Sequence, residues 1–183
     1  MEFITRSLRI REFVEGDYPA LWEMDSFAQM HTYERIPPTE SDTRQGLSES
    51  ISSQGQSPRT LFRLAITIPP QDIARGIIKI NRQWEAIREW EVGWAMHPAE
   101  WGKGYATEAA WQVMNYAFKE LNVHRIVAFC HAENRASVRV MEKLGMHNDG
   151  RLRETRFLNG AWWDEFVYSV LDREWKARNP PAS

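Results

Sequence analysis

The segment from Glu91 to Ala109 constrains the fold of this chain more than any other segment. It begins with a mostly apolar run, typical of a strand, and ends in the first turns of an amphipathic helix. Between the two, Gly102 and Gly104 allow positive φ angles and a close approach of the backbone to a ligand. The first N–H groups of a helix have no partners inside the helix. A glycine turn that opens directly onto a helix is therefore suited to bind an anion such as a pyrophosphate.

The glycine turn alone is weak evidence for a function. A dinucleotide-binding fingerprint needs a third glycine three residues after Gly104, and Thr107 stands there. Gly102-Lys103-Gly104 does not fit the Gly-Lys-Ser/Thr end of a Walker A loop either. On this segment alone, a plain tight turn leading into a helix remains an alternative.

The composition excludes several classes of protein. The chain has 183 residues and a formal net charge of −2, without the basic excess of a nucleic-acid-binding surface. Its one cysteine, Cys130, excludes a disulfide framework and a zinc site of several thiolates, and we expect a buried side chain there. Charged residues interrupt every apolar run of Met1–Phe13, and no stretch approaches the ~20 apolar residues of a membrane span. We therefore expect a cytoplasmic protein that binds neither membranes nor nucleic acids.

The periodicity of the chain predicts one α/β domain over residues 1–183. Strands are expected at Leu8–Phe13, Leu61–Ile68, Ile73–Asn81, Trp90–Met96 and Arg125–Cys130. Helices are expected around Leu21–Met24, at Thr43–Ser53, at Tyr105–Leu121 and at Asn134–Leu144. Asn159-Gly160 between two strand-like runs predicts a hairpin, and Pro37-Pro38 places a loop over Ala28–Asp42. This order of strands and helices favours a mixed sheet.

A second motif follows about thirty residues after the glycine turn. It reads Asn-x-x-Ser-x-x-x-x-Glu-Lys-Leu-Gly over Asn134–Gly145. Together with Trp-Gly-Lys-Gly-Tyr-Ala-Thr-Glu-Ala over Trp101–Ala109, it resembles the GNAT superfamily of acyltransferases, specifically the RimJ/RimL-like branch that acetylates ribosomal-protein N-termini. The resemblance extends from Arg9–Arg11, similar to the family's first strand, to Phe157–Gly160 with Asp164, similar to its final hairpin. It implies a mixed, mostly antiparallel sheet of six to seven strands flanked by helices, with splayed central strands.

The resemblance also implies acetyl-CoA as co-substrate, without a metal. The residues whose backbone N–H groups would hold the pyrophosphate are Gly102, Lys103, Gly104, Tyr105, Ala106 and Thr107. The pantetheine arm would lie between the splayed strands Val92–Met96 and Arg125–Cys130, bonded to main-chain groups of Trp94, Ala95 and Met96 and contacted by Asn134. Trp101 stands where the wider superfamily has Gln or Arg. Because the phosphate contacts are made by the backbone, this difference leaves the interpretation intact.

Acetyl transfer to an amine requires three things: a deprotonated amine, a stabilised oxyanion and a protonated leaving thiolate. Ser137 is the candidate for the thiolate, because some family members use a serine at this place. Others use a tyrosine four residues later, where this chain has Met141. The alternative for Ser137 is that its hydroxyl hydrogen-bonds back to the start of its own helix.

The candidate for the general base is Glu91, which matches the place where other superfamily members hold a base. Its alternative role is a carboxylate at a sheet edge, paired with an arginine. Some relatives carry a glutamate directly before Phe-Leu-Asn-Gly, but Arg156 stands there, so that role does not transfer. Glu154 and Glu165 are weaker candidates.

Two further routes for the proton stay open. His31 and His97 could act through water, although a lone histidine is more often a capping or surface residue. Proton transfer through water without a dedicated base is the other route.

Lys103 is either a phosphate contact or solvated. Because side chains along a strand point to opposite faces in turn, we expect one of Trp162 and Trp163 in the core and the other available to a pocket or partner.

The acceptor stays open at the level of sequence. The resemblance places the acceptor site near the loop that carries His31, Tyr33 and Glu34, and it suggests a peptide N-terminus. A small-molecule amine such as an antibiotic or polyamine is the first alternative. A CoA-binding regulatory protein without catalysis is the second. We expect a monomer or a homodimer.

Overall fold

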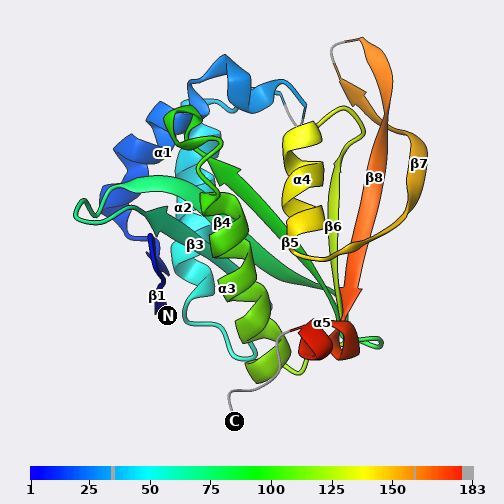
Figure 1. Ribbon diagram of the computed structural model, residues 1–183. Helices are drawn as coiled ribbons and strands as arrows, with labels where there is room; N and C mark the ends of the chain where they lie inside the picture. The colour runs from blue at the N-terminus through cyan, green and yellow to red at the C-terminus, as the bar shows by residue number, and fades with distance from the viewer. Residues whose placement is uncertain (34–35, 159, 179–183) are drawn as a thin grey trace.

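The computed structural model describes residues 1–33, 36–158 and 160–178, and its centre is one eight-stranded sheet (Figure 1). The strands are β1 (Glu2–Ile4), β2 (Arg9–Glu12), β3 (Leu61–Thr67), β4 (Ala74–Trp84), β5 (Glu89–Met96), β6 (Arg125–His131), β7 (His147–Leu158) and β8 (Ala161–Leu171). The α-helices are α1 (Tyr18–Asp25), α2 (Glu40–Ser53), α3 (Tyr105–Glu120), α4 (Arg135–Lys143) and α5 (Asp172–Arg178). Short 3-10 helices are η1 (Glu15–Asp17), η2 (Ala28–His31) and η3 (Pro98–Glu100).

The sheet has the order β1-β2-β3-β4-β5-β6-β8-β7, and each pair of neighbours is antiparallel except β5 and β6. These two parallel strands pair only at Glu89↔Arg125, Trp90↔Ile126 and Glu91↔Val127. Beyond Glu91 the strands separate, which confirms the expected splay of the central strands. The mixed, mostly antiparallel sheet is also confirmed. The expected number of six to seven strands was too low, because β1 is only three residues long and its sequence carries no clear alternation.

Helices cover both faces of the sheet, and successive residues of one strand serve the two faces in turn. On β3, Leu64 and Ile66 belong to the main core under α3 and α4, whereas Ala65 packs in a second cluster with Leu21 and Leu47 of α1 and α2. Cys130 is 2% exposed in the main core, as expected.

Helix boundaries differ from the expectations where a polar cap moves them. α2 begins at Glu40, three residues before the expected Thr43, because the Thr39 hydroxyl accepts the Asp42 N–H while the Asp42 carboxylate accepts the Thr39 N–H. α4 begins after the expected cap Asn134. α5 was not predicted. Gly160 has φ of +80° at the expected hairpin, whose other turn residue, Asn159, lies outside the described residues.

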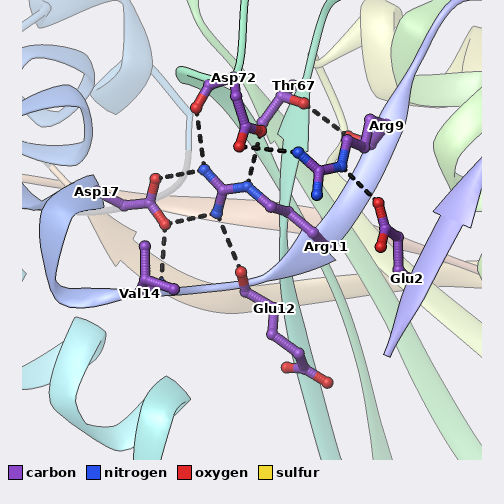
Figure 2. Close-up of polar contacts among 8 residues, drawn as sticks. All are labelled: Glu2, Arg9, Arg11, Glu12, Val14, Asp17, Thr67 and Asp72. Atoms are coloured by element: carbon purple, nitrogen blue, oxygen red, sulfur yellow. Dashed lines mark hydrogen bonds and ion pairs between the residues drawn. The ribbon is translucent and has the colours of Figure 1, made fainter.

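An ion-pair network fixes the N-terminal part of the sheet (Figure 2). Arg11 on β2 forms a double hydrogen bond with the Asp17 carboxylate, 2.8 Å for each nitrogen–oxygen pair, and a further bond of 2.9 Å to Asp72. Asp72 also accepts from Arg9, which bonds Glu2 at 2.5 Å. The network ties β1, β2, η1 and the β3–β4 loop together.

None of the helices in the described part of the chain is long and apolar enough to cross a membrane.

Candidate active site

Two cavities meet where β5 and β6 separate. The first has a volume of about 800 Å³ and extends over the glycine turn and the start of α4. The second, of about 430 Å³, opens between β4, β5, β6 and β8. The residues that line both are Lys79, Gly93, Trp94, Ser137 and Arg156. The two cavities therefore adjoin at the splay.

The glycine turn forms one end of the first cavity. Gly102 and Gly104 have φ of +77° and +87°, and Gly104 is the N-cap of α3. Such angles strain any side-chain-bearing residue, so the predicted need for glycine is confirmed. The Trp101 indole N–H donates to the Met96 carbonyl at 2.7 Å, which fastens the turn to the end of β5.

The start of α3 faces the same cavity. Gly102, Gly104, Tyr105, Ala106 and Thr107 all line it, together with Trp94, Ala95 and Met96 from β5. The Nζ of Lys103 donates to the Glu100 carboxylate at 2.9 Å, and this hydrogen bond raises the pKa of Lys103. Lys103 is thus ion-paired beside the turn, and its side chain is outside the lining of the cavity.

The second motif places Ser137 at the junction of the two cavities. The Asn134 side chain accepts the Ser137 backbone N–H at 3.0 Å, which caps α4 as predicted. In the part of the chain that the structure describes, the Ser137 hydroxyl makes no hydrogen bond to the helix start. The structure gives the alternative structural role of this hydroxyl no support, and Asn134 performs the capping. Met141, four residues later, is fully buried in the core.

Glu91 lies at the last position of β5 that pairs with β6, and it lines the second cavity. One carboxylate oxygen accepts from the Gln83 amide, and the other is 3.9 Å from the Nζ of Lys79. Its side chain is 26% exposed. The alternative of a carboxylate paired with an arginine is not what the described residues show, because the neighbouring strand β4 offers a lysine and an amide on this face.

The two weaker carboxylate candidates differ in position. Glu165 lines the second cavity, with Oε1 2.5 Å from the Nε of Arg156 and Oε2 accepting from the Thr155 hydroxyl at 2.9 Å. Glu154 lines neither cavity. It has φ of +51° in a bulge of β7, where its backbone N–H donates to Asp164. This bulge sends Glu154 outward and brings Arg156 to the cavities.

Neither of the two histidines considered from sequence lines a cavity. His97 accepts the Ala99 N–H with Nδ1 and caps η3, as expected for a capping histidine. The Nε2 of His31 is 2.7 Å from the Asp25 carbonyl.

The sequence did not point to His131, which ends β6, is 3% exposed and lines the second cavity. The expected strand stopped one residue earlier, at Cys130, and no motif includes this histidine. Its ring packs against Tyr33 and Trp163, with centroid distances of 5.2 and 4.7 Å.

The loop expected near the acceptor contributes to the first cavity. Gln29, Met30, Thr32 and Tyr33 line it, whereas Glu34 lies outside the described residues. Trp163 is half-buried and donates to the Leu158 carbonyl, while Trp162 is 60% exposed beside Phe157. Exposure therefore alternates as expected, but Trp163 belongs to neither core cluster. Among the described residues, no group of three or more His, Cys, Asp or Glu is arranged to hold a metal ion.

Comparisons with known proteins agree with this geometry. The family model of the acetyltransferase (GNAT) domain matches residues 7–147. An uncharacterized N-acetyltransferase of Bacillus subtilis, YnaD, is 33% identical over 96% of this chain and 99% of its own. A putative ribosomal N-acetyltransferase of the same organism, YdaF, is 32% identical over 55% of each chain. The crystal structure of a GNAT-family acetyltransferase from Bacillus anthracis superposes with a TM-score of 0.82 at 32% identity, covering 95% of this chain and 100% of that one. The chain therefore belongs to the GNAT family and is an acyl-CoA-dependent N-acetyltransferase.

Proposed function

We propose that acetyl-CoA occupies the first cavity, that a primary amine enters the second, and that the acetyl group passes between them at the splay. The observation that carries this proposal is that the two cavities adjoin, with Ser137, Gly93 and Trp94 lining both. The whole chain, residues 1–183, would act as one GNAT domain in the cytoplasm, as a monomer or homodimer.

The residues around the first cavity suit the donor. The backbone N–H groups of Gly102–Thr107 lie at a helix start, where the helix leaves them without partners, and would bind the pyrophosphate. Residues Trp94–Met96 do not pair with β6, so their main-chain groups on that side would bond the pantetheine amides. Asn134 would contact the same arm. No metal takes part in this scheme.

The residues at the junction suit the chemistry. Glu91 would accept a proton from the acceptor amine, directly or through one water, and leave a nucleophilic nitrogen. The nitrogen then forms a bond to the thioester carbon and releases its remaining extra proton to solvent, and collapse of the tetrahedral intermediate breaks the carbon–sulfur bond. The Ser137 hydroxyl would donate to the leaving thiolate, and Ser137 is reprotonated from solvent. The products are the N-acetyl amide and coenzyme A.

For the acceptor, the resemblance to RimJ/RimL-like enzymes and the similarity to the putative ribosomal N-acetyltransferase support the α-amine of a protein N-terminus. The small-molecule alternative is a free amine that enters the same cavity. Release of free CoA thiol, measured with N-terminal peptides and small amines side by side, distinguishes the two. A chain that binds acetyl-CoA in calorimetry and acetylates none of them would be a CoA-binding protein without catalysis.

The role of Ser137 has a direct test. Ser137→Ala removes only the hydroxyl and keeps the cap, because Asn134 bonds the backbone N–H. We expect kcat to fall about tenfold or more, with little change in melting temperature or in acetyl-CoA affinity. A fully active Ser137→Ala enzyme would remove the serine from the mechanism.

A further inference from the structure

The second cavity contains hydrogen-bond donors that the proton transfers above do not use. Lys79 and Arg156 line it from β4 and β7, on opposite sides of the splay, and His131 lines it from the end of β6. Two of these groups are full cations at neutral pH. Because Glu91 and Glu165 line the same cavity, it presents groups of both charges to a ligand.

His131 is held as a hydrogen-bond donor. Its Nδ1 accepts the Glu133 backbone N–H at 3.1 Å, so the neutral imidazole carries its proton on Nε2. Nε2 could act as a base only if the proton moved to Nδ1, and this would break the Glu133 bond. The packed rings of Tyr33 and Trp163 restrict its rotation. His131 thus offers an Nε2–H to a ligand in the second cavity.

The two carboxylates of the second cavity already have cationic neighbours. Glu165 is 8% exposed, lies 2.5 Å from Arg156 and also accepts from Thr155. Glu91 has only the distant Lys79, at 3.9 Å, and the Gln83 amide. Glu91 is therefore suited to receive one ammonium group. A second or third ammonium of a polyamine would find no uncompensated carboxylate among the described residues that line this cavity.

We infer that the acceptor carries a carboxylate a few bonds from its amine, with the ammonium beside Glu91 and the carboxylate held by Arg156, Lys79 and the His131 Nε2–H. Arginine is suited to this task because its planar fork matches a carboxylate. The inference rests on the proposed function and specifies its acceptor. The carboxylate can belong to a free amino acid, which the volume of about 430 Å³ accommodates, or to an acidic first residue of a peptide.

Matched acceptors test the inference. The best of the twenty amino acids is compared with its carboxamide, with the amine that lacks the carboxyl group, and with spermidine. Each kcat/KM is divided by the fraction of free amine, since these amines differ in pKa. We expect the carboxylate form to be at least tenfold better. Peptides that begin with Asp or Glu, compared with Asn or Gln, decide whether the carboxylate can come from a side chain.

Variants identify the residue responsible. Arg156→Gln leaves Glu165 buried without its cation, so Arg156→Gln/Glu165→Gln is measured beside it, with thermal unfolding of both. We expect the ratio of kcat/KM between the amino acid and its decarboxylated amine to fall at least tenfold in both variants. Arg153→Gln is the control, because Arg153 is exposed on the same bulge and lines neither cavity.

The outcomes separate the two proposals. Equal or faster turnover of the carboxamide or the decarboxylated amine overturns the carboxylate inference and leaves acetyl transfer intact. An unchanged ratio in both Arg156 variants also overturns it. If acetyl-CoA binds and no amine is acetylated, the proposed function fails, and this inference fails with it.

Discussion

Charged residues gather in two regions of this molecule, and they are arranged in opposite ways. In the N-terminal network, Arg11 is 11% exposed and bonds both oxygens of Asp17 as well as Asp72. At the splay, Glu91 lines a cavity, accepts from the Gln83 amide and has, among the described residues, one cation at 3.9 Å. Fully paired buried charges stabilise a fold, whereas a carboxylate beside a cavity with a more distant cation remains available to a ligand. The comparison therefore predicts stability defects from the first region and activity defects from the second.

The largest effect is expected from Asp17→Asn. It removes the charge from a carboxylate that is only 5% exposed and that also accepts the Val14 N–H. Loss of one partner of a buried pair costs about 3 kcal/mol of unfolding free energy, at the lower end of the usual range because Arg11 keeps Asp72. Urea unfolding measures this, and kcat below the melting transition should stay at the wild-type value. A stable variant with impaired turnover would contradict the structural role of the network.

Glu91→Gln should give the reverse result. We expect kcat to fall roughly 10²-fold because the amide cannot accept a proton, while acetyl-CoA affinity and the melting temperature stay close to wild type. Steady-state kinetics over a pH series measures this. Glu154→Gln is the matched control, since Glu154 lies outside both cavities. A near-wild-type rate in Glu91→Gln would move the role to Glu165 or to water.

Gly104→Val tests the donor end of the site. A Cβ at Gly104 meets no protein atom within 4 Å, but φ of +87° is unfavourable for valine, and the Cβ would lie where the phosphates approach. We expect acetyl-CoA to bind at least tenfold more weakly, about 1.4 kcal/mol. Calorimetry measures the affinity and circular dichroism the fold. Gly150→Val is the control, because Gly150 also has open space around it but no positive φ.

The sequence predicted those parts of the site that depend on local geometry. The Gly102–Gly104 turn, the Asn134 cap and the splay follow from residues close together in the chain or from a specific motif. The surroundings of Glu91 and Arg156 could not be predicted, because they depend on pairing across strands. Lys79 reaches Glu91 from β4, and a bulge in β7 decides that Arg156, and not Glu154, lies at the cavity. This bulge adds two residues to β7 between Leu152 and Arg156, so Arg156 and not Glu154 pairs with Trp163, and no sequence signal marks the insertion.

Asp72→Asn should have the smallest effect and a distinct pH dependence. Asp72 is 51% exposed, so its bonds to Arg11 and Arg9 contribute less than about 1 kcal/mol. The hydrogen bond from Arg11 lowers the pKa of Asp72 in the folded protein. Its contribution is therefore complete above the ordinary aspartate pKa of about 3.9 and is lost as the pH falls through the lower folded value. The difference in unfolding free energy between wild type and Asp72→Asn should be constant from about pH 5 to 7 and should shrink below about pH 4. Urea unfolding at each pH measures it. A difference that grows on acidification would show that Asp72 is not held by Arg11, and the network would then depend on Asp17 alone.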